Sequence, residues 1–480
     1  MKTYSREQFV KDVTAGIIVA IIALPLSIAL ALASGVGPEA GIFTAIVAGF
    51  VISALGGSSV QIAGPTAAFA TIVAGIVAKN GLDGLVIATI LAGIFLVLMG
   101  LCHFGTLIRF IPYTITTGFT AGIAVTIVIG QLKDFFGVTY PDGVKPIETM
   151  EKLHAFVENC GTVNLSAVIV GVVSLAILII SPYIFKKIPG SLLAVVAGIL
   201  MVKFLPLKAS TIGDLYSISN SLPGFHLPAL SLAAVEDAIP NAFTIAVLAA
   251  IESLLSCVVA DGMINGKHRS DMELVAQGAG NIASALFGGI PATGAIARTA
   301  ANIKNGGRTP IAGMVHSITL VLVLVVLMPY AGMIPMPTIA AILFVVAYNM
   351  CQWRTFTHLI QTAPKSDILV LLVTFFLTVV FDLVVAIEIG MLLTCLLFMK
   401  RMSDETHVDS WTYVDDDSDA VNDHMQKLAK EIRVYEITGP LFFGAANAIE
   451  HIVVKDFTKC LVLRMRSVTA LDSTAMNALQ

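Results

Sequence analysis

Two stretches of the chain decide the fold: GGSSVQIAGPTAAF at residues 56–69 and GGIPATGAIARTAANI at residues 288–303. Both follow a similar apolar run, SAL before the first and SALF before the second, so the second copy carries one insertion. Each stretch indicates a short extended segment, a glycine and then the start of a helix. Gly64-Pro65 suits such a start, because proline at the first helical position loses no hydrogen bond, and Gly294 holds the matching place in the second copy. Matched interruptions in two halves of a membrane protein are typical of inverted-repeat transporters.

The composition places most of the chain in lipid. Hydrophobic residues make up 57% of the chain and charged residues only 12%, and the mean hydropathy is +0.90. A soluble domain carries about 25% charged residues, so a water-exposed fold does not account for this chain. We expect an all-α polytopic membrane protein, because most of fourteen apolar segments approach the ~20 residues that cross the hydrocarbon core. These segments are 13–35, 40–57, 62–78, 84–102, 114–132, 163–182, 188–205, 239–260, 272–287, 292–304, 310–329, 335–350, 367–381 and 383–400.

The sequence argues against several other classes and predicts an orientation. The net charge of −4 includes no basic concentration, so we expect no nucleic-acid partner. No C-x-x-C or H-E-x-x-H motif occurs, and we expect no metal, no cofactor and no enzymatic activity. The first apolar run lacks a cleavage pattern and is expected to stay as a span. The bias of Lys and Arg between alternate loops places both termini in the cytoplasm.

The C-terminal part changes character after the last apolar segment. Residues 402–430 are acidic and polar and indicate a linker that leaves a membrane domain at 1–401. Residues 431–480 combine two short apolar strands, near 433–439 and 460–465, with helical spacing, as in an α/β domain. About 50 residues are few for a stable domain of this kind, so we expect this domain to be incomplete.

The paired interruptions predict a binding site for an anion. Extended backbone at membrane depth is tolerated only where it is buried or lines a cavity. Half-helices that start near Pro65 and Ala295 would point free backbone N–H groups and partial positive charge at that cavity, an arrangement that favours an anion. The alternative is that these glycines serve only the close packing of helices, but a matched pair in two halves favours the site.

Two ionisable residues lie inside apolar segments, where charge is costly and is functional by default. Glu252 lies within TIAVLAAIESLLSCVVADG, and Arg298 follows the start of the second half-helix. Arg298 suits an anionic ligand, and Glu252 either pairs with Arg298 or carries a proton. A buried ion pair that only fixes the fold is the alternative. The candidate hydroxyl donors are Thr66, Ser253, Ser256 and Thr293.

Four runs together resemble one family. They are ALPLSIALALASGVGPEAGIFTAIVAGF, GGSSVQIAGPTAAF, AAIESLLSC and GGIPATGAIARTAANIKNGGRTP, and they closely resemble the SulP family of anion transporters, to which prestin and pendrin belong. The tail from about Glu431 resembles the first half of the STAS domain that follows the membrane part in that family. The resemblance covers essentially the whole chain.

The resemblance implies fourteen transmembrane segments in a 7+7 inverted repeat. A core domain of spans 1–4 and 8–11 would move against a gate domain of spans 5–7 and 12–14 in an elevator-like cycle. Short β-strands are implied in spans 3 and 10. The family is commonly dimeric, and we expect a homodimer in the bacterial inner (plasma) membrane.

Site residues are also implied by the resemblance. Serines stand in many animal members where this chain has Ala295 and Ala297, so these two positions offer only backbone N–H groups. The implied residues are Leu26 and Leu30 in the first span, Ala63, Gly64, Thr66 and Ala67 in the third, Glu252 and Ser256 in the eighth, and Thr293, Gly294, Ala295, Ile296, Ala297 and Arg298 in the tenth.

We expect a secondary active transporter of a small inorganic or organic anion, such as sulfate, bicarbonate or a dicarboxylate, with a proton as the coupling ion. A protonated Glu252 would remove a competing negative charge and free Arg298 for the substrate. Sodium-coupled bicarbonate relatives carry aspartate and a later threonine where this chain has Glu252 and Ser256, which favours protons but leaves sodium open. The sequence also leaves open anion exchange, an uncoupled channel, a nucleobase–proton symporter and a scaffold that acts through residues 431–480. Arg298 argues against a neutral nucleobase.

Overall fold

The structure, a computed structural model, describes all residues except 1–3, 107–111, 142–145, 185–188, 206, 217, 219–220, 229–230, 382, 412–431, 446–448, 450–451, 453 and 455–457. Its internal contacts divide the chain into two compact units, Met1–Glu388 and Ile389–Gln480.

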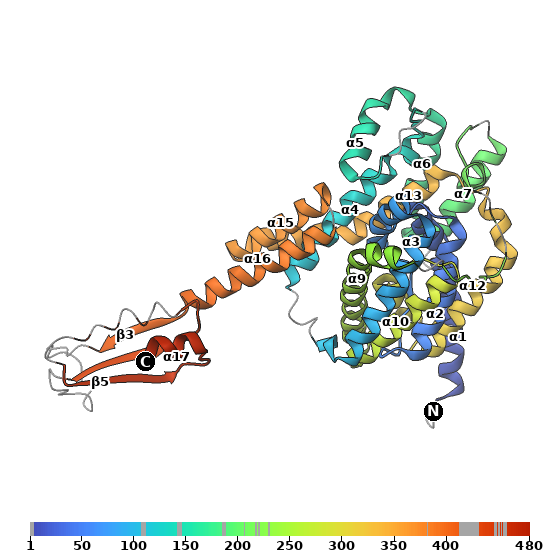
Figure 1. The fold of residues 1–480 in the computed structure, drawn as a ribbon. Helices are drawn as coiled ribbons and strands as arrows, with labels where there is room; N and C mark the ends of the chain where they lie inside the picture. Colours follow the sequence, from blue (N-terminus) through green and yellow to red (C-terminus); the bar gives the residue numbers. More distant parts are fainter. Residues whose placement is uncertain are drawn as a thin grey trace. The chain divides into compact units, whose positions relative to one another are not determined.

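The first unit is built almost wholly from helices, many of them long (Figure 1). Two very short strands, β1 (Ala63–Gly64) and β2 (Thr293–Gly294), interrupt the helical pattern. From the N-terminus, the helices before residue 140 are α1 (Arg6–Ala33), α2 (Pro38–Leu55), α3 (Ala67–Leu101) and α4 (Tyr113–Phe136). They are followed by α5 (Thr149–Glu158), the 3₁₀ turn η2 (Cys160–Thr162), α6 (Leu165–Ile184), α7 (Gly190–Phe204), α8 (Ile212–Leu215), α9 (Leu232–Ile264) and α10 (Ser270–Leu286). The remaining helices are α11 (Ile296–Lys304), α12 (Pro310–Ala331), α13 (Met336–Cys351), α14 (Trp353–Thr362), α15 (Lys365–Val380) and α16 (Leu383–Asp404), the last of which continues into the second unit.

The lengths of these helices confirm a helical polytopic membrane fold. Within the described part of the chain, eight helical runs are long and apolar enough to cross a membrane: α1, α2, α3, α4, α6, α9, α12 and Met336–Thr362. The helix α3 has 35 residues, more than one span needs, and it is broken at Gly81, where a φ of 71° departs from helical geometry. This break divides α3 near the boundary between the segments predicted at 62–78 and 84–102. The count of fourteen spans stays a prediction.

The helices of the first unit pack in two groups. In one group α10 packs against α3 and α2, α3 packs against α9, and α12 packs against α1 and α2, so that α1, α2, α9, α10 and α12 lie side by side (Figure 1). In the other group α4 packs against α13 and α15, and α6 packs against α13 and α7. Contacts between the groups run mainly from α1 and α3 to α4, α7 and α13.

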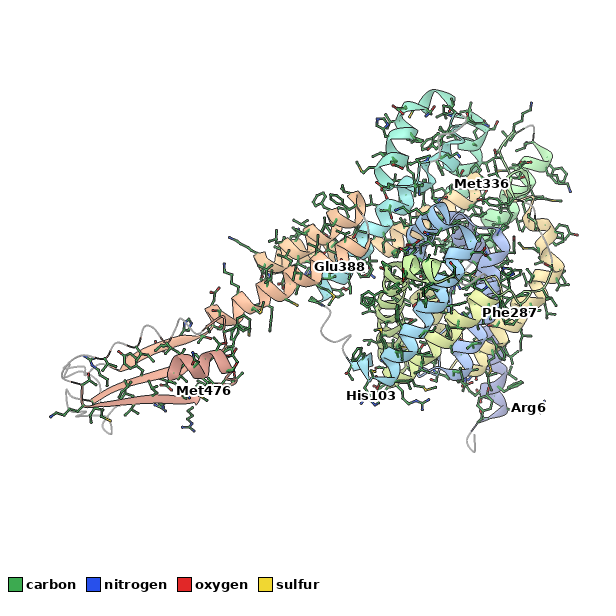
Figure 2. The ribbon with its side chains drawn as sticks, in the orientation of Figure 1. Arg6, His103, Phe287, Met336, Glu388 and Met476 are labelled. Atoms are coloured by element: carbon green, nitrogen blue, oxygen red, sulfur yellow. The ribbon has the colours of Figure 1, made fainter. Side chains whose placement is uncertain are left out.

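Small residues make the close packing of the first group possible. The buried side of α1 includes Ala15, Gly16, Ala20 and Ala23. In lipid, helices associate through close contact of their backbones and not through the hydrophobic effect, so small residues are favoured where they meet. The side chains fill the interior of the unit, with Phe287 directly after the end of α10 (Figure 2).

The second unit contains a three-stranded sheet of β3 (His407–Trp411), β4 (Ile432–Thr438) and β5 (Cys460–Ser467). The central strand β4 is antiparallel to β3 and parallel to β5, and α17 (Ser473–Leu479) follows β5. Ile437, Leu441 and Ala475 are buried together and form the core of this unit. The two strands predicted near 433–439 and 460–465 are therefore confirmed.

The start of the predicted linker differs from the structure. Within 402–430, Met402–Asp404 still belong to α16, and His407–Trp411 form β3, while residues 412–430 lie outside the described part. Val408 packs against the core of the second unit and pairs with Ile437 of β4. The acidic neighbours of Val408 hide this single apolar contact in the sequence, and so the segment resembles a linker.

Candidate functional site

The two interrupted stretches meet as a pair of strands. β1 and β2 are antiparallel, with Ala63 opposite Gly294 and Gly64 opposite Thr293. The backbone N–H of Ala295 also donates to the carbonyl of Ile62 over 3.0 Å. The short strands predicted in spans 3 and 10 are thus present, and each completes the backbone hydrogen bonds that the other leaves open. An unpaired extended backbone would be costly at this depth in a membrane.

A helix begins at each end of this strand pair. Because the strands are antiparallel, α3 and α11 leave the pair in opposite directions, with their N-termini separated only by the two-residue strands. Neither N-terminus is capped by a side chain: Thr66 is the N-cap of α3 and Ala295 that of α11, and neither side chain accepts a bond from its helix. By contrast, Ser5 caps α1 in the usual way. The first backbone N–H groups of α3 and α11 therefore donate to no capping side chain of the described residues and remain available to a ligand.

The two sides of the α11 N-terminus differ in exposure. Ile296 and Ala297 are exposed and Ala295 is half-buried, whereas Arg298 is only 1% exposed. Thr66 at the start of α3 is half-buried, while Ala67 is buried. The most accessible of the predicted residues at the two helix starts are therefore Ile296 and Ala297, followed by Ala295 and Thr66.

The guanidinium of Arg298 lies inside the protein, beside the first strand. Its Nη2 donates to the Ser27 hydroxyl and to the Pro65 carbonyl, both over 3.2 Å. Its Nε and Nη1 have no hydrogen-bond partner among the described residues. A side chain at Gly64 would collide with Nη1, so the glycine lets the cation approach the backbone of β1. Arg298 thus places a full positive charge next to the strand pair from which both helix N-termini start.

Glu252 of α9 contacts the N-cap residue of α3. Its Oε2 accepts a 2.9 Å hydrogen bond from the Thr66 hydroxyl, and the residue is half-buried. Arg298 bonds instead to Ser27 and Pro65, so these two described residues form no ion pair with each other. Of the two roles predicted for Glu252, pairing with Arg298 is not found, and a proton-carrying role stays a prediction.

The predicted hydroxyl donors on α9 and β2 hold the strand pair in place. The Thr293 hydroxyl lies 2.6 Å from that of Ser253 and donates to the carbonyl of Ala249, while Ser253 accepts from the N–H of Gly294. The Ser256 hydroxyl lies 3.4 Å from that of Thr299. Thr293, Ser253 and Ser256 are fully buried, so their hydroxyls serve the geometry of the site.

The first span approaches the site through α1. Leu26 is half-buried and Leu30 is 2% exposed, so Leu26 is the more accessible of the two predicted residues. Ser27, directly after Leu26, carries the polar contact to Arg298.

Known proteins share the sequence that builds this site. A family model described as the sulfate permease family matches residues 9–374, which include both interrupted stretches. The chain belongs to the sulfate permease family. It is 41% identical to the putative sulfate transporter YvdB of Bacillus subtilis, over 99% of this chain and 88% of that protein. It is 32% identical to the bicarbonate transporter BicA of a Picosynechococcus species, over 98% of this chain and 85% of that protein.

Solved structures agree with this assignment. The transmembrane domain of a cyanobacterial bicarbonate transporter BicA matches with a TM-score of 0.70 and 28% identity, covering 81% of this chain and 98% of that one. The murine Solute Carrier 26 family member A9 anion transporter, in an inward-facing state, matches in fold with a TM-score of 0.88 and 18% identity, covering all of this chain and 84% of that one. The curated relatives are transporters, in agreement with the prediction that the chain is not an enzyme.

One buried carboxylate of this sulfate permease family member, Glu273 of α10, was not predicted from the sequence. Its Oε2 accepts from the N–H groups of Gly57 and Ser58, and its Oε1 accepts from the amides of Gln61 and Gln277. The three bonds from Gly57, Ser58 and Gln61 fix the segment that leads into β1, and the fourth comes from Gln277 on α10 itself. Glu273 follows Asp271 in the first turn of a helix, where acidic residues are common and exposed, so its local pattern carried no signal.

Asn281, about two helical turns after Glu273 on α10, fixes the second interrupted stretch in a similar way. Its amide bonds both the N–H and the carbonyl of Ala292, just before β2. Asn281 is fully buried, and a polar residue inside the apolar segment 272–287 was the signal that could have found it.

Proposed function

We propose that this protein carries a small anion across the membrane as a secondary active transporter, with the anion bound at the N-termini of α3 and α11. One observation carries the proposal: two uncapped helix N-termini start from one strand pair, and the buried cation of Arg298 lies beside that pair. Backbone N–H groups and a cation favour a ligand with negatively charged oxygen atoms. Sulfate, bicarbonate and dicarboxylates share this chemistry, and the names of the relatives support the first two.

The proposed coupling ion is a proton carried by Glu252. The carboxylate is bonded to Thr66, the N-cap of α3, at the end of the helix where the anion is proposed to bind. An ionised carboxylate there repels the substrate, and a protonated one does not. Anion and proton would therefore bind together, and the loaded site would carry less negative charge through the membrane than the site with the anion alone.

The proposed architecture is that of fourteen spans in a 7+7 inverted repeat with elevator-type alternating access. The two packing groups of helices in the first unit support a core domain, which carries the site, and a gate domain against which it moves. The proposed STAS domain corresponds to residues 431–480, where β4, β5 and α17 give a strand–strand–helix arrangement. We further propose a homodimer in the bacterial inner membrane with both termini in the cytoplasm.

Sodium-coupled transport of bicarbonate is the second candidate, and the relative named as a bicarbonate transporter supports bicarbonate as its substrate. Exchange of two anions and an uncoupled channel would use the same fold. Uptake of radiolabelled sulfate, bicarbonate and succinate into proteoliposomes separates these mechanisms. Stimulation by an inward proton gradient supports proton coupling, loss of uptake when choline replaces sodium supports sodium coupling, and a need for internal anion supports exchange. Currents far above the turnover of a carrier support a channel.

The same assay tests the main proposal. We expect uptake of at least one of the three anions, and we expect Arg298→Ala to lower its apparent affinity roughly tenfold or more. If none of the anions enters the vesicles under any gradient, and none binds to the purified protein, the proposed function is wrong.

A further inference from the structure

A polar cavity lies apart from the strand pair. It has a volume of about 300 Å³ and lies between the C-terminal end of α1, the first turns of α3, the C-terminal half of α4 and the loop helix α5. Its polar side chains are those of Thr71, Thr126, Gln131, Asp134 and Lys152.

The inner end of this cavity approaches the proposed anion site. Thr71 lies about one helical turn after Ala67, the first residue of α3. Its hydroxyl is 3.4 Å from that of Thr126 on α4. The cavity thus extends along α3 from the loop helix towards the N-terminus at which the substrate is proposed to bind.

Lys152 is the one cation among the described residues that line this cavity. It is half-buried, and none of the described residues forms an ion pair with it. Its neighbour Glu151 is occupied elsewhere: its carboxylate accepts from the N–H groups of Ile147 and Glu148 and closes a capping box at the start of α5. Burial lowers the pKa of Lys152, and the charge of Glu151 offsets this effect only in part. A half-buried ammonium that forms no ion pair with the described residues can bind an anion beside it.

The helix α5 holds Lys152 in a defined place. The capping box fixes its first turn, and the Phe156 ring lies 5.6 Å from the Phe136 ring at the end of α4. The lysine therefore projects from an ordered helix into the cavity. Its ammonium is a compact charge with three donors, which suits oxygen atoms of an anion.

Asp134 lines the same cavity and has the opposite effect. It is half-buried near the C-terminal end of α4, and it forms no ion pair with Lys152. A carboxylate close to a bound anion weakens its binding by repulsion. Attraction by Lys152 and repulsion by Asp134 together suit weak binding of an anion in this cavity. Weak binding is what a site requires if the anion is to move on to α3 and α11.

We propose that this cavity is a capture site for the transported anion, in which the ammonium of Lys152 and the amide of Gln131 bind an oxyanion or carboxylate before it moves to α3 and α11. Asp134 keeps the binding weak. This proposal rests on the proposed function for the direction of movement, but the binding of an anion at Lys152 is tested without transport.

The first test compares transport kinetics in proteoliposomes. We expect Lys152→Gln to raise KM about tenfold at an unchanged maximal rate, which corresponds to about 1.4 kcal/mol, and Lys152→Arg to stay near the native value. Asp134→Asn should lower KM. The control is Lys208→Gln, an exposed lysine in the loop before α8 that does not line the cavity. An unchanged KM in Lys152→Gln overturns the proposal. A rise of KM in Asp134→Asn as well would indicate that the two residues act as a pair, which also contradicts it.

The second test measures binding alone. Purified protein is treated with an amine-reactive reagent, and the modification of Lys152 and Lys208 is followed by peptide mass spectrometry. We expect sulfate, bicarbonate or succinate to protect Lys152 and not Lys208. Protection without any transport would leave the capture site standing while the proposed function fails. Transport with neither protection nor a KM change would reject the capture site alone.

Discussion

The hydroxyl of Thr66 donates a 2.9 Å hydrogen bond to Oε2 of Glu252, a residue 186 positions further along the chain. Thr66 is the N-cap of α3, and its hydroxyl is therefore turned away from the helix that it begins. The bond places a carboxylate beside a free helix N-terminus, where a substrate anion would otherwise be the only negative group. The pair thus connects the charge state of Glu252 with the occupancy of the proposed site.

The first prediction concerns this carboxylate. Glu252→Gln keeps an oxygen that accepts from Thr66 but carries no charge at any pH. We expect uptake to lose its stimulation by an inward proton gradient and to become independent of external pH, because no competing charge remains to be neutralised. Initial uptake rates at several external pH values measure this. Glu236→Gln, on the first turns of α9 and away from the strand pair, is the matched control. A pH profile in Glu252→Gln that follows the native one would rule out this coupling.

The second prediction concerns Arg298. Replacement by alanine removes the buried cation and leaves the Ser27 hydroxyl and the Pro65 carbonyl without their donor. We expect a loss of apparent anion affinity of roughly tenfold or more, since a charged group beside a ligand contributes about 1.5–3 kcal/mol. Arg298→Lys should recover part of this affinity, because it keeps the charge without the planar fork. Equal losses in both variants would show that packing, and not charge, is what the site needs.

The third prediction tests the approach of Arg298 to the first strand. A Cβ on Gly64 collides with Nη1 of Arg298, whereas a Cβ on Gly75, further along α3, meets no atom within 4 Å. We expect Gly64→Ala to abolish uptake and Gly75→Ala to preserve it. Purified yields and melting temperatures of the two variants show whether Gly64→Ala still folds. Native uptake by Gly64→Ala would mean that the guanidinium moves away freely and that its position does not matter.

The fourth prediction concerns stability. Glu273→Ala leaves four donors without their acceptor, among them the buried amide of Gln61. We expect a loss of at least about 3 kcal/mol, because each unsatisfied buried polar group costs about 1–3 kcal/mol. Glu158→Ala, an exposed change at the end of α5, should stay within about 0.5 kcal/mol. Thermal unfolding in detergent compares them, and similar melting temperatures would contradict the role given to Glu273.

The fifth prediction concerns the second unit and pH. Asp472 caps α17 and accepts from the N–H groups of Ala475 and Phe443, both over 2.8 Å, and these bonds lower its pKa below the ordinary value of 3.8. A lowered folded-state pKa stabilises the fold above about pH 4 and loses this contribution as the pH falls through the folded-state value. Asp472→Asn should therefore unfold this unit more easily at neutral pH, with a difference that shrinks in acid. Hydrogen exchange of the α17 amides at both pH values measures this, and a constant difference would refute the ionic part of the cap.

The sequence was most informative where a chemical requirement repeats. The two interrupted stretches and Arg298 were singled out because glycine, proline and charge are rare choices inside an apolar segment, and the structure places Arg298 beside the strand pair. The short strands in spans 3 and 10 were implied by the resemblance, but their pairing was not predicted; it is explained by the cost of unpaired extended backbone at membrane depth.

The hydrogen-bond partners of hydroxyl groups were harder to predict from the sequence. Thr293 and Ser256 were predicted as substrate donors, but in the structure both make bonds that fix β2 and α11. A serine or threonine has several acceptors within reach, and its sequence position does not determine which one it uses. In the first span, the resemblance implied Leu26, but the neighbouring Ser27 makes the polar contact to Arg298.

Glu273 and β3 were missed because their neighbours are charged. An acidic residue near the start of a helix is ordinarily exposed, and an apolar residue between acidic ones ordinarily belongs to a linker. In both cases tertiary contacts with distant segments, the loop before β1 and the strand β4, override the local pattern. Such contacts cannot be read from a window of adjacent residues.

The pairing of β1 with β2 also determines when the anion site can form during biosynthesis. The N–H of Ile62 bonds to the Thr299 hydroxyl, a partner 237 residues later in the chain. At roughly 5–20 residues per second, the ribosome needs on the order of 10–50 s to supply that partner. During this interval the first half enters the bilayer with an unpaired strand and an unfinished pocket. The anion site is therefore among the last features of the protein to form, and a nascent chain that stalls before residue 299 is inserted in the membrane without it.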